Sequence, residues 1–247
     1  MGDIFFDIAA AVILALNIFL FYYKRHLFSL QTRIFVILLW TSLFSTSADM
    51  ITALINASPG RYPLWFLYAS NELFFISQNS VPFLFSLYVL AMTGRLQQLK
   101  KSAWTAFGSP YALAVLAILG TPFLRSIFYF DASLAYLHGP GLTLLYLIAF
   151  LYIGLAVTCT TRYRHAMPER TVFAVYSFVL VSVLPTAIQY FNPHLLIQCL
   201  GIAISELLIL QSVQNPAEFL DSGTRLFNRS GFVYELICSG QTKPGFT

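Results

Sequence analysis

The chain has 247 residues, of which 58% are hydrophobic and only 10% are charged, and its formal net charge is +4. A soluble domain has about 25% charged residues, so this composition excludes an ordinary soluble protein and predicts a polytopic membrane protein. The cysteines Cys159, Cys199 and Cys238 form no spaced set. We therefore expect neither a disulfide framework nor a Cys-based zinc site, and no metal site is predicted.

Seven stretches are long and apolar enough to cross a bilayer as helices, which takes about 20 residues each. In chain order they are residues 4–22, 34–55, 64–91, 103–119, 141–160, 172–191 and 195–213. The first is not expected to be a signal peptide, because it carries Asp7 and no basic residue precedes it. Pro82 and Pro185 fall inside the third and sixth stretches, where proline favours a kink. The predicted fold class is an all-α membrane protein, with a seven-transmembrane helix bundle over residues 1–213.

Basic residues are distributed unevenly between the connections. The first, third and fifth connections carry Lys24, Arg25, Arg33, Arg95, Lys100, Lys101, Arg162, Arg164 and Arg170. The even-numbered connections carry only Arg61 and Arg125. Because short cytoplasmic loops are enriched in Lys and Arg, we expect the N-terminus outside and the C-terminus in the cytoplasm. The prediction is a multi-pass protein of the plasma or inner membrane, whose positive charge reflects topology in the lipid bilayer and does not indicate a nucleic-acid partner.

Acidic residues inside the predicted spans are the first candidates for a functional site. Asp49, Glu72 and Glu206 lie within spans, and no Lys or Arg does. Ionisable groups at membrane depth are costly and usually face the bundle interior or a water-filled cavity. Asp49 and Glu72 both lie roughly 10–12 Å below the outer surface at 1.5 Å per residue, so their carboxylates are placed to meet.

Uncharged polar residues accompany these carboxylates at helical spacing. We therefore predict a binding site for an unknown small ligand, open to the outside. Its candidate residues are Asp49, Glu72, Gln78, Asn79, Gln189, Gln198 and Glu206. The alternative stays open that the polar side chains are packing contacts between helices, which is their usual role in membranes.

A second helix is predicted directly after the last span. Asn215 is placed as its N-cap and Pro216 as its first residue, with Glu218 close to a capping box. Few residues then separate the span from the polar stretch that follows. A short, stiff connection transmits a displacement that a flexible Gly/Ser linker would dissipate, so this arrangement favours a receptor.

The stretch 221–232 carries a recognisable pattern. Its characteristic positions are Asp221, Thr224, Leu226, Asn228, Arg229 and Phe232. The pattern resembles the opening of a GGDEF domain, the catalytic module of bacterial diguanylate cyclases. The seven-span region also looks like the bacterial seven-helix sensors that precede such modules. Gly223 and Arg225 depart from the family pattern, in which an apolar residue and a glycine stand at these positions.

The resemblance implies that residues 214–247 are a linker and the short α-helical N-terminal fragment of a truncated α/β domain. It also implies that Asp221 and Arg229 pair to hold its opening turn. The residues expected to relay a signal are Asn215, Pro216, Asp221, Thr224, Asn228 and Arg229. Within these 247 residues we expect no catalytic residue and no cofactor.

The function implied is a sensor region that relays a ligand signal to a cytoplasmic diguanylate-cyclase-type module and so to cyclic di-GMP. The full-length protein is expected to be diguanylate cyclase-like. GTP and Mg²⁺ are implied only for the missing output module, and a homodimer is expected to form through it. The alternative is a small transporter or channel that uses the buried carboxylates Asp49, Glu72 and Glu206.

Overall fold

The computed structural model describes residues 4–23, 29–58, 60–192 and 195–213, which are mostly helical. The long helices are α1 (Ile4–Tyr23), α2 (Leu30–Asn56), α3 (Leu64–Met92), α4 (Lys101–Leu119), α6 (Leu142–Arg162) and α7 (Glu169–Phe191). The shorter elements are η1 (Leu96–Gln98), α5 (Thr121–Leu124), β1 (Phe128–Phe130), β2 (Tyr136–His138), η2 (Arg164–Ala166) and α8 (Gln198–Ser212).

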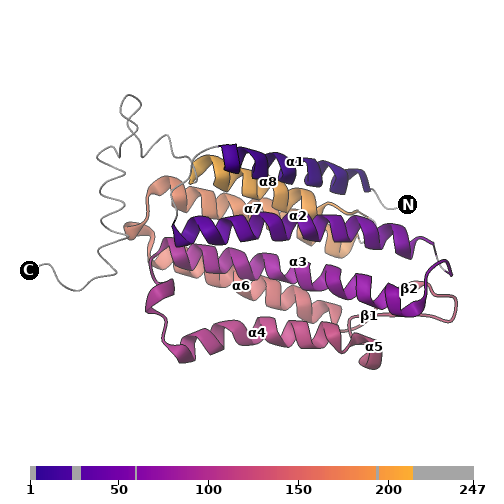
Figure 1. Cartoon of the computed structure of the whole chain (residues 1–247). Coiled ribbons are helices and arrows are strands. Elements are labelled where there is room, and N and C mark those ends of the chain that lie inside the picture. The colour runs from indigo at the N-terminus through magenta and orange to yellow at the C-terminus, as the bar shows by residue number, and fades with distance from the viewer. Residues whose placement is uncertain (1–3, 24–28, 59, 193–194, 214–247) are drawn as a thin grey trace, which may run out of the picture.

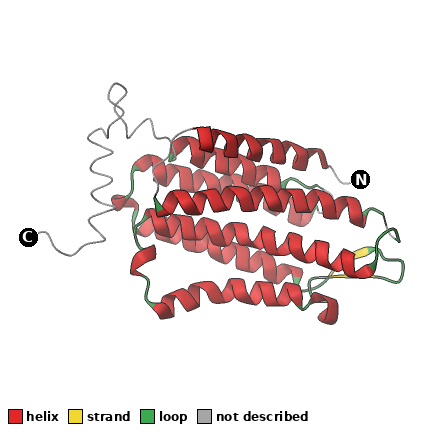
Figure 2. Ribbon diagram, in the orientation of Figure 1, coloured by secondary structure: helices red, strands yellow, loops and turns green. Residues whose placement is uncertain are grey.

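The long helices lie side by side and form one elongated bundle (Figures 1 and 2). Helix α8 packs against α1, α7 and α2, whereas α4 lies on the outer side of the bundle against α3 and α6. Helices α2, α4 and α7 end on the side of the bundle that carries the small β-sheet, where α3, α6 and α8 begin. We call this side the hairpin end.

Six of these helices are long and apolar enough to cross a membrane, namely α1, α2, α3, α4, α6 and α7. Each coincides with one of the first six predicted spans within a few residues. The seventh predicted span, 195–213, corresponds to α8, which is apolar but has only 15 residues. Its rise of about 22 Å is shorter than the roughly 30 Å hydrocarbon core of a bilayer.

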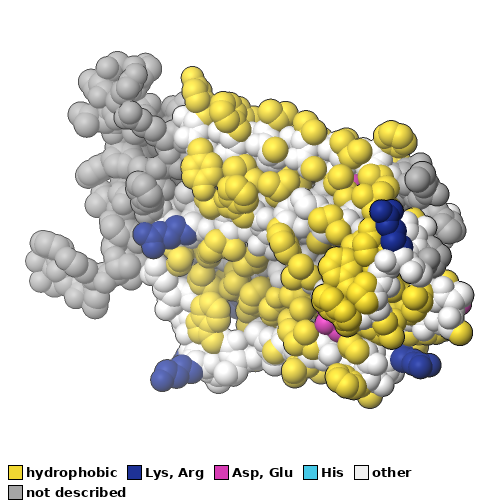
Figure 3. Space-filling model, turned by 45° about the vertical axis from the view of Figure 1, so that its right-hand side comes forward, with side chains coloured by type: hydrophobic (Ala, Val, Ile, Leu, Met, Phe, Trp, Pro, Cys, Tyr) yellow, Lys and Arg dark blue, Asp and Glu magenta, His cyan; other side chains and the backbone are white. Residues whose placement is uncertain are grey.

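The outer surface of the bundle is strongly apolar. In Figure 3 hydrophobic side chains cover most of the visible face, and the Lys and Arg side chains lie toward the two ends of the bundle. On α7, Phe173 and Leu180 are 70% and 69% exposed. A large contiguous apolar surface marks an interaction surface, and with six apolar helices it fits a membrane protein.

Local sequence explains where several helices begin and end. Ser29 is the N-cap of α2, and its hydroxyl accepts a hydrogen bond from the backbone N–H of Thr32 at 3.1 Å. Helix α2 therefore starts at Leu30, before the apolar stretch 34–55 that was predicted as the span. At the end of α3, Gly94 adopts φ +68° and its N–H donates to the carbonyl of Ala91 at 3.0 Å. Glycine tolerates this left-handed conformation, which stops the helix.

A two-stranded antiparallel hairpin interrupts the helical pattern between α5 and α6. Strand β1 pairs with β2 in the register Phe128–His138, Tyr129–Leu137 and Phe130–Tyr136. The ring of Phe128 packs on Phe75 of α3, with ring centroids 5.6 Å apart. The expected all-α fold is therefore correct for the bundle but misses this hairpin, because its three-residue strands are stabilised by contacts with a distant helix.

Helices α7 and α8 approach each other closely at Gly201. A Cβ atom at that position would lie 2.6 Å from Cγ of Pro185 and 2.8 Å from the carbonyl oxygen of Val181. Both α3 and α7 continue through their prolines, Pro82 and Pro185. Small residues let membrane helices pack backbone against side chain, so Gly201 fixes the position of α8 on α7.

Candidate functional site

A cavity of about 810 Å³ lies at the hairpin end, between α2, α3, α6, α7 and α8. Five predicted site residues line it, namely Asp49, Gln78, Asn79, Gln189 and Gln198. Its remaining lining combines aromatic and aliphatic side chains with hydroxyl groups such as those of Ser182 and Thr186. A largely apolar cavity of this size with a few convergent polar groups is typical of a small-molecule site.

Helices α2 and α3 form the first polar wall of the cavity. The hydroxyl of Ser45 donates to Oε1 of Gln78 at 2.7 Å. Nearer the hairpin end, the amides of Asn56 and Asn71 exchange two hydrogen bonds, at 3.0 and 3.1 Å. These bonds between helices fix the side chains that the cavity presents, so a ligand meets a preorganised surface.

Helices α7 and α8 form the opposite wall. Oε1 of Gln189 accepts a hydrogen bond from the backbone N–H of Gln198 at 2.9 Å. This N–H belongs to the first turn of α8, whose N-cap residue Ile197 supplies no side-chain cap. Gln189 therefore caps α8 from the neighbouring helix, and its amide links the cavity wall to the start of that helix.

The hairpin supplies the third part of the lining, through Tyr136, Leu137, His138 and Gly139. The Tyr136 hydroxyl lies 3.4 Å from Nδ1 of His138. Partial removal from water lowers the pKa of His138 below its ordinary value of 6.5 and raises the pKa of Tyr136. Both side chains therefore stay uncharged at neutral pH and offer hydrogen bonds to a ligand without adding a charge.

A tight backbone junction anchors the hairpin to the start of α6. The N–H groups of Gly139 and Gly141 donate to the carbonyls of Ile127 and Ser126, both at 2.7 Å. A Cβ atom on Gly139 would lie 2.3 Å from the carbonyl oxygen of Ser126, so only glycine fits there. This contact keeps β2 over the cavity.

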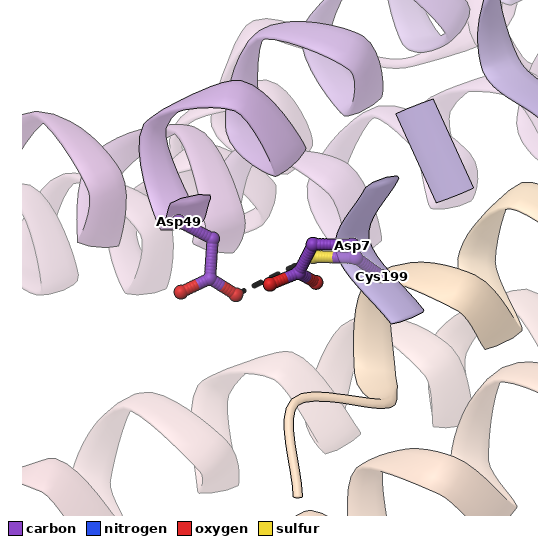
Figure 4. Close-up of side chains that lie close together, drawn as sticks. All are labelled: Asp7, Asp49 and Cys199. Atoms are coloured by element: carbon purple, nitrogen blue, oxygen red, sulfur yellow. Dashed lines mark hydrogen bonds between the residues drawn. The ribbon is translucent and has the colours of Figure 1, made fainter. Parts of the chain in front are cut away.

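Three titratable side chains meet beside the cavity, and we call them the acid–thiol cluster: Asp7 of α1, Asp49 of α2 and Cys199 of α8. Figure 4 shows the two carboxylates and the thiol pointing toward one another. Their ligand-type atoms all lie within 4.8 Å of one another, and the Cys199 thiol donates to Oδ2 of Asp49 at 3.6 Å. The exposed fractions of Asp7, Asp49 and Cys199 are 0%, 6% and 2%.

Sequence reasoning missed Asp7 as a site residue. In the sequence, Asp7 indicates only that the first span is not a signal peptide. The missed signal is the combination of a carboxylate within an apolar helix and the absence of Lys and Arg from residues 1–23. Among the residues that the structure describes, neither carboxylate oxygen of Asp7 has a hydrogen-bond partner.

The other two predicted carboxylates lie outside the cavity lining. Glu206 is fully buried in α8, where its Oε1 accepts a hydrogen bond from the Ser42 hydroxyl. Glu72 is partly buried in α3 and does not belong to the acid–thiol cluster. Within the described part of the chain, Oε2 of Glu206 and Oε1 of Glu72 have no hydrogen-bond partner.

The predicted relay residues are Asn215, Pro216, Asp221, Thr224, Asn228 and Arg229, and all of them lie outside the described residues. Comparison with known proteins adds no assignment: no family model matches the chain, and no curated protein does. The candidate site is therefore defined by the cavity and by the acid–thiol cluster at its edge.

Proposed function

We propose that this chain is the ligand-sensing membrane region of a signalling protein that controls a cytoplasmic diguanylate-cyclase-type module. The observation that carries the proposal is the cavity of about 810 Å³, which includes the first residue of α8 in its lining. A ligand in this cavity would contact the same helix that leads toward residues 214–247.

In the proposed topology α8 is the seventh span, with the N-terminus outside and the C-terminus in the cytoplasm. Its 15 residues are short for a span, but α1, α2 and α7 surround it, so it meets little lipid. The excess of basic residues in the odd-numbered connections supports the orientation. The cavity then faces the outside of the cell, and the end of α8 faces the cytoplasm.

The contacts of α8 make it a suitable relay. The Asn17 amide of α1 donates to the carbonyl of Ala203 at 3.2 Å, and the Ser205 hydroxyl donates to the carbonyl of Phe178 on α7, also at 3.2 Å. With the cap from Gln189, these bonds hold α8 against both neighbours. A ligand that displaces Gln189 or Gln198 would move α8, which is about 22 Å long, as a rigid rod.

The ligand class follows from the cavity lining. The acidic group in the lining is the carboxyl group of Asp49, while amides, hydroxyls and aromatic rings make up most of the remaining polar surface. A small, neutral or cationic molecule with an apolar body fits this chemistry, because the aromatic and aliphatic walls favour apolar surface. An anionic ligand finds no Lys or Arg side chain to pair with among the lining residues.

Binding is tested with the full chain in lipid nanodiscs, by screening small neutral and cationic molecules with an apolar body for an increase in melting temperature. Gln78→Leu removes an amide from the cavity wall and is expected to weaken binding of a hit. Thr161→Val is the matched control, because Thr161 is exposed and lies at the opposite end of the bundle. Equal binding by both variants would remove the cavity from the proposal.

The relay is tested by reading the gene beyond the codon for Thr247 and by inserting alanines after Val213. One inserted residue rotates everything that follows by about 100°, and four restore the phase approximately. We expect cyclic di-GMP production by the extended protein to vary with this helical period. A gene without a nucleotide-cyclase module after residue 247 would refute the proposed output.

A transporter remains the second candidate, favoured by the buried carboxylates Asp49 and Glu206, which lie in helices without a nearby Lys or Arg. Proteoliposomes that contain the full chain and a pH-sensitive dye test this alternative. A receptor leaves the internal pH unchanged when a proton gradient is applied. Proton uptake that Glu206→Gln abolishes would favour transport instead.

A further inference from the structure

We propose that Asp7, Asp49 and Cys199 bind a divalent metal ion of the zinc class at the edge of the cavity. This site goes beyond the proposed function, because a bound metal can be detected without the cavity ligand and without the output module. The three donors come from α1, α2 and α8, which are distant in sequence and adjacent in the bundle.

One distance within the acid–thiol cluster matches that between two ligands of a tetrahedral site. A zinc ion bound to a carboxylate oxygen at about 2.1 Å and to a thiolate at about 2.3 Å holds these two atoms about 3.6 Å apart. Oδ2 of Asp49 and Sγ of Cys199 lie 3.6 Å apart. The cluster as a whole fits within 4.8 Å, so a small shift of the Asp7 side chain would bring the third donor to the metal.

Asp7 is the observation that points to a bound ligand. Its side chain is fully buried and aimed at the other two groups (Figure 4). Within the described residues both of its oxygens lack a hydrogen-bond partner. A buried carboxylate without partners is strongly unfavourable, and coordination of a metal ion is one of the few ways to compensate it.

No Lys or Arg side chain of the three helices that supply the donors lies close enough to compensate the carboxylate of Asp7. Helices α1 and α8 contain no Lys or Arg, and α2 contains only Arg33. Arg33 lies 16 residues from Asp49, which corresponds to about 24 Å along the helix. A divalent cation supplies the missing positive charge to two carboxylates and a thiolate at one point.

The donor types favour one class of metal. Thiolate is a soft ligand that selects zinc-like ions, whereas Mg²⁺ and Ca²⁺ prefer oxygen ligands alone. Binding requires the Cys199 thiol to lose the proton that it donates to Asp49, and this proton is released to the solvent as the sulfur bonds to the metal.

The cavity provides access and an open coordination position. Asp49 lines the cavity, and so does Gln198, the residue directly before Cys199. Three protein ligands leave the fourth position of a tetrahedral zinc ion free for water or another small donor. The metal would therefore face the cavity, where a small molecule with a donor atom can reach it.

The site is tested with the full chain in nanodiscs. Cobalt titrated into the metal-free protein is expected to give a thiolate-to-cobalt charge-transfer absorption in the near ultraviolet. Zinc is expected to abolish it by competition, at about one Zn²⁺ per chain by elemental analysis. Because these measurements use the unaltered sequence, they do not depend on whether a variant folds.

Variants then assign the donors. Cys199→Ser is expected to remove the charge-transfer absorption and Asp7→Asn to weaken zinc binding by more than about 10-fold. The double variant Cys159→Ser/Cys238→Ser is the control, because it removes the other two cysteines and keeps Cys199. The proposal is overturned if the unaltered chain shows no charge-transfer absorption and no bound zinc, or if the control loses both while Cys199→Ser keeps them.

Discussion

The close contact of α7 and α8 predicts a specific loss of stability for Gly201→Ala. The added methyl group would lie 2.6 Å from Cγ of Pro185 and 2.8 Å from the carbonyl oxygen of Val181. Both distances are shorter than van der Waals contact, and neither a proline ring nor a backbone carbonyl moves easily. The two helices must therefore separate by a few tenths of an ångström or more.

The magnitude follows from two opposing effects. Forcing an extra methyl group into a packed contact costs about 1–3 kcal/mol. Replacing a glycine in a helix by alanine stabilises the folded state by about 0.5–1 kcal/mol. The net destabilisation of Gly201→Ala is therefore roughly 0–2.5 kcal/mol. Gly154 of α6 is the matched control, because a Cβ atom there has no neighbour within 4 Å and Gly154→Ala keeps only the gain.

The assay is reversible unfolding in mixed micelles, followed by circular dichroism. Because both variants share the change in helix propensity, the difference between their unfolding free energies isolates the steric cost, at about 1–3 kcal/mol. If Gly201→Ala is as stable as Gly154→Ala, the close approach of α8 to Pro185 is wrong.

Three further predictions concern α4 and the hairpin. The Tyr152 hydroxyl donates to the carbonyl of Phe107 at 2.6 Å and accepts from the N–H of Tyr111 at 3.0 Å, so Tyr152→Phe should lower the free energy of unfolding by about 1–3 kcal/mol. The pKa of His138 in the folded chain lies below 6.5, so the unfolded chain protonates this imidazole more readily. The stability of the protein should therefore fall as the pH drops below 6.5. Thermal melts of His138→Gln should lack this pH-dependent loss of stability. Hydrogen bonds from Ser133 and Ala135 lower the pKa of Asp131 below 3.8. The stabilisation from this carboxylate should be present above pH 3.8 and disappear as the pH falls through the pKa of Asp131 in the folded chain. NMR spectra of the hairpin in Asp131→Asn should not show this loss.

Hydropathy predicted the long helices well, because burial in lipid imposes a minimum length that a single sequence displays. Boundaries were less accurate where polar residues continue a helix. Helix α2 begins at Leu30, four residues before the predicted span, because Ser29 caps it. The hairpin left no such signal: its strands have three residues each, and contacts with Phe75 and Tyr68 of α3 stabilise them.

Only part of the site could be predicted, because the depth of a residue along a helix says nothing about which way the residue faces around it. Asn71, Phe75 and Gln78 of α3 all line the cavity. Glu72 lies about 100° around the helix from Asn71, which places it at the edge of this face. Depth alone therefore suggested a meeting of Asp49 with Glu72, whereas Asp49 lies against Asp7 and Cys199.

The first turn of α8 concentrates the features on which the proposals depend. Gln198 lines the cavity, and its backbone N–H donates to Oε1 of Gln189. Cys199 belongs to the acid–thiol cluster, and Gly201 contacts Pro185. A ligand in the cavity and a metal ion at the cluster would therefore act on the same few residues. Two linked binding sites affect each other reciprocally. If zinc changes the affinity for a cavity ligand by some factor, that ligand should change the affinity for zinc by the same factor.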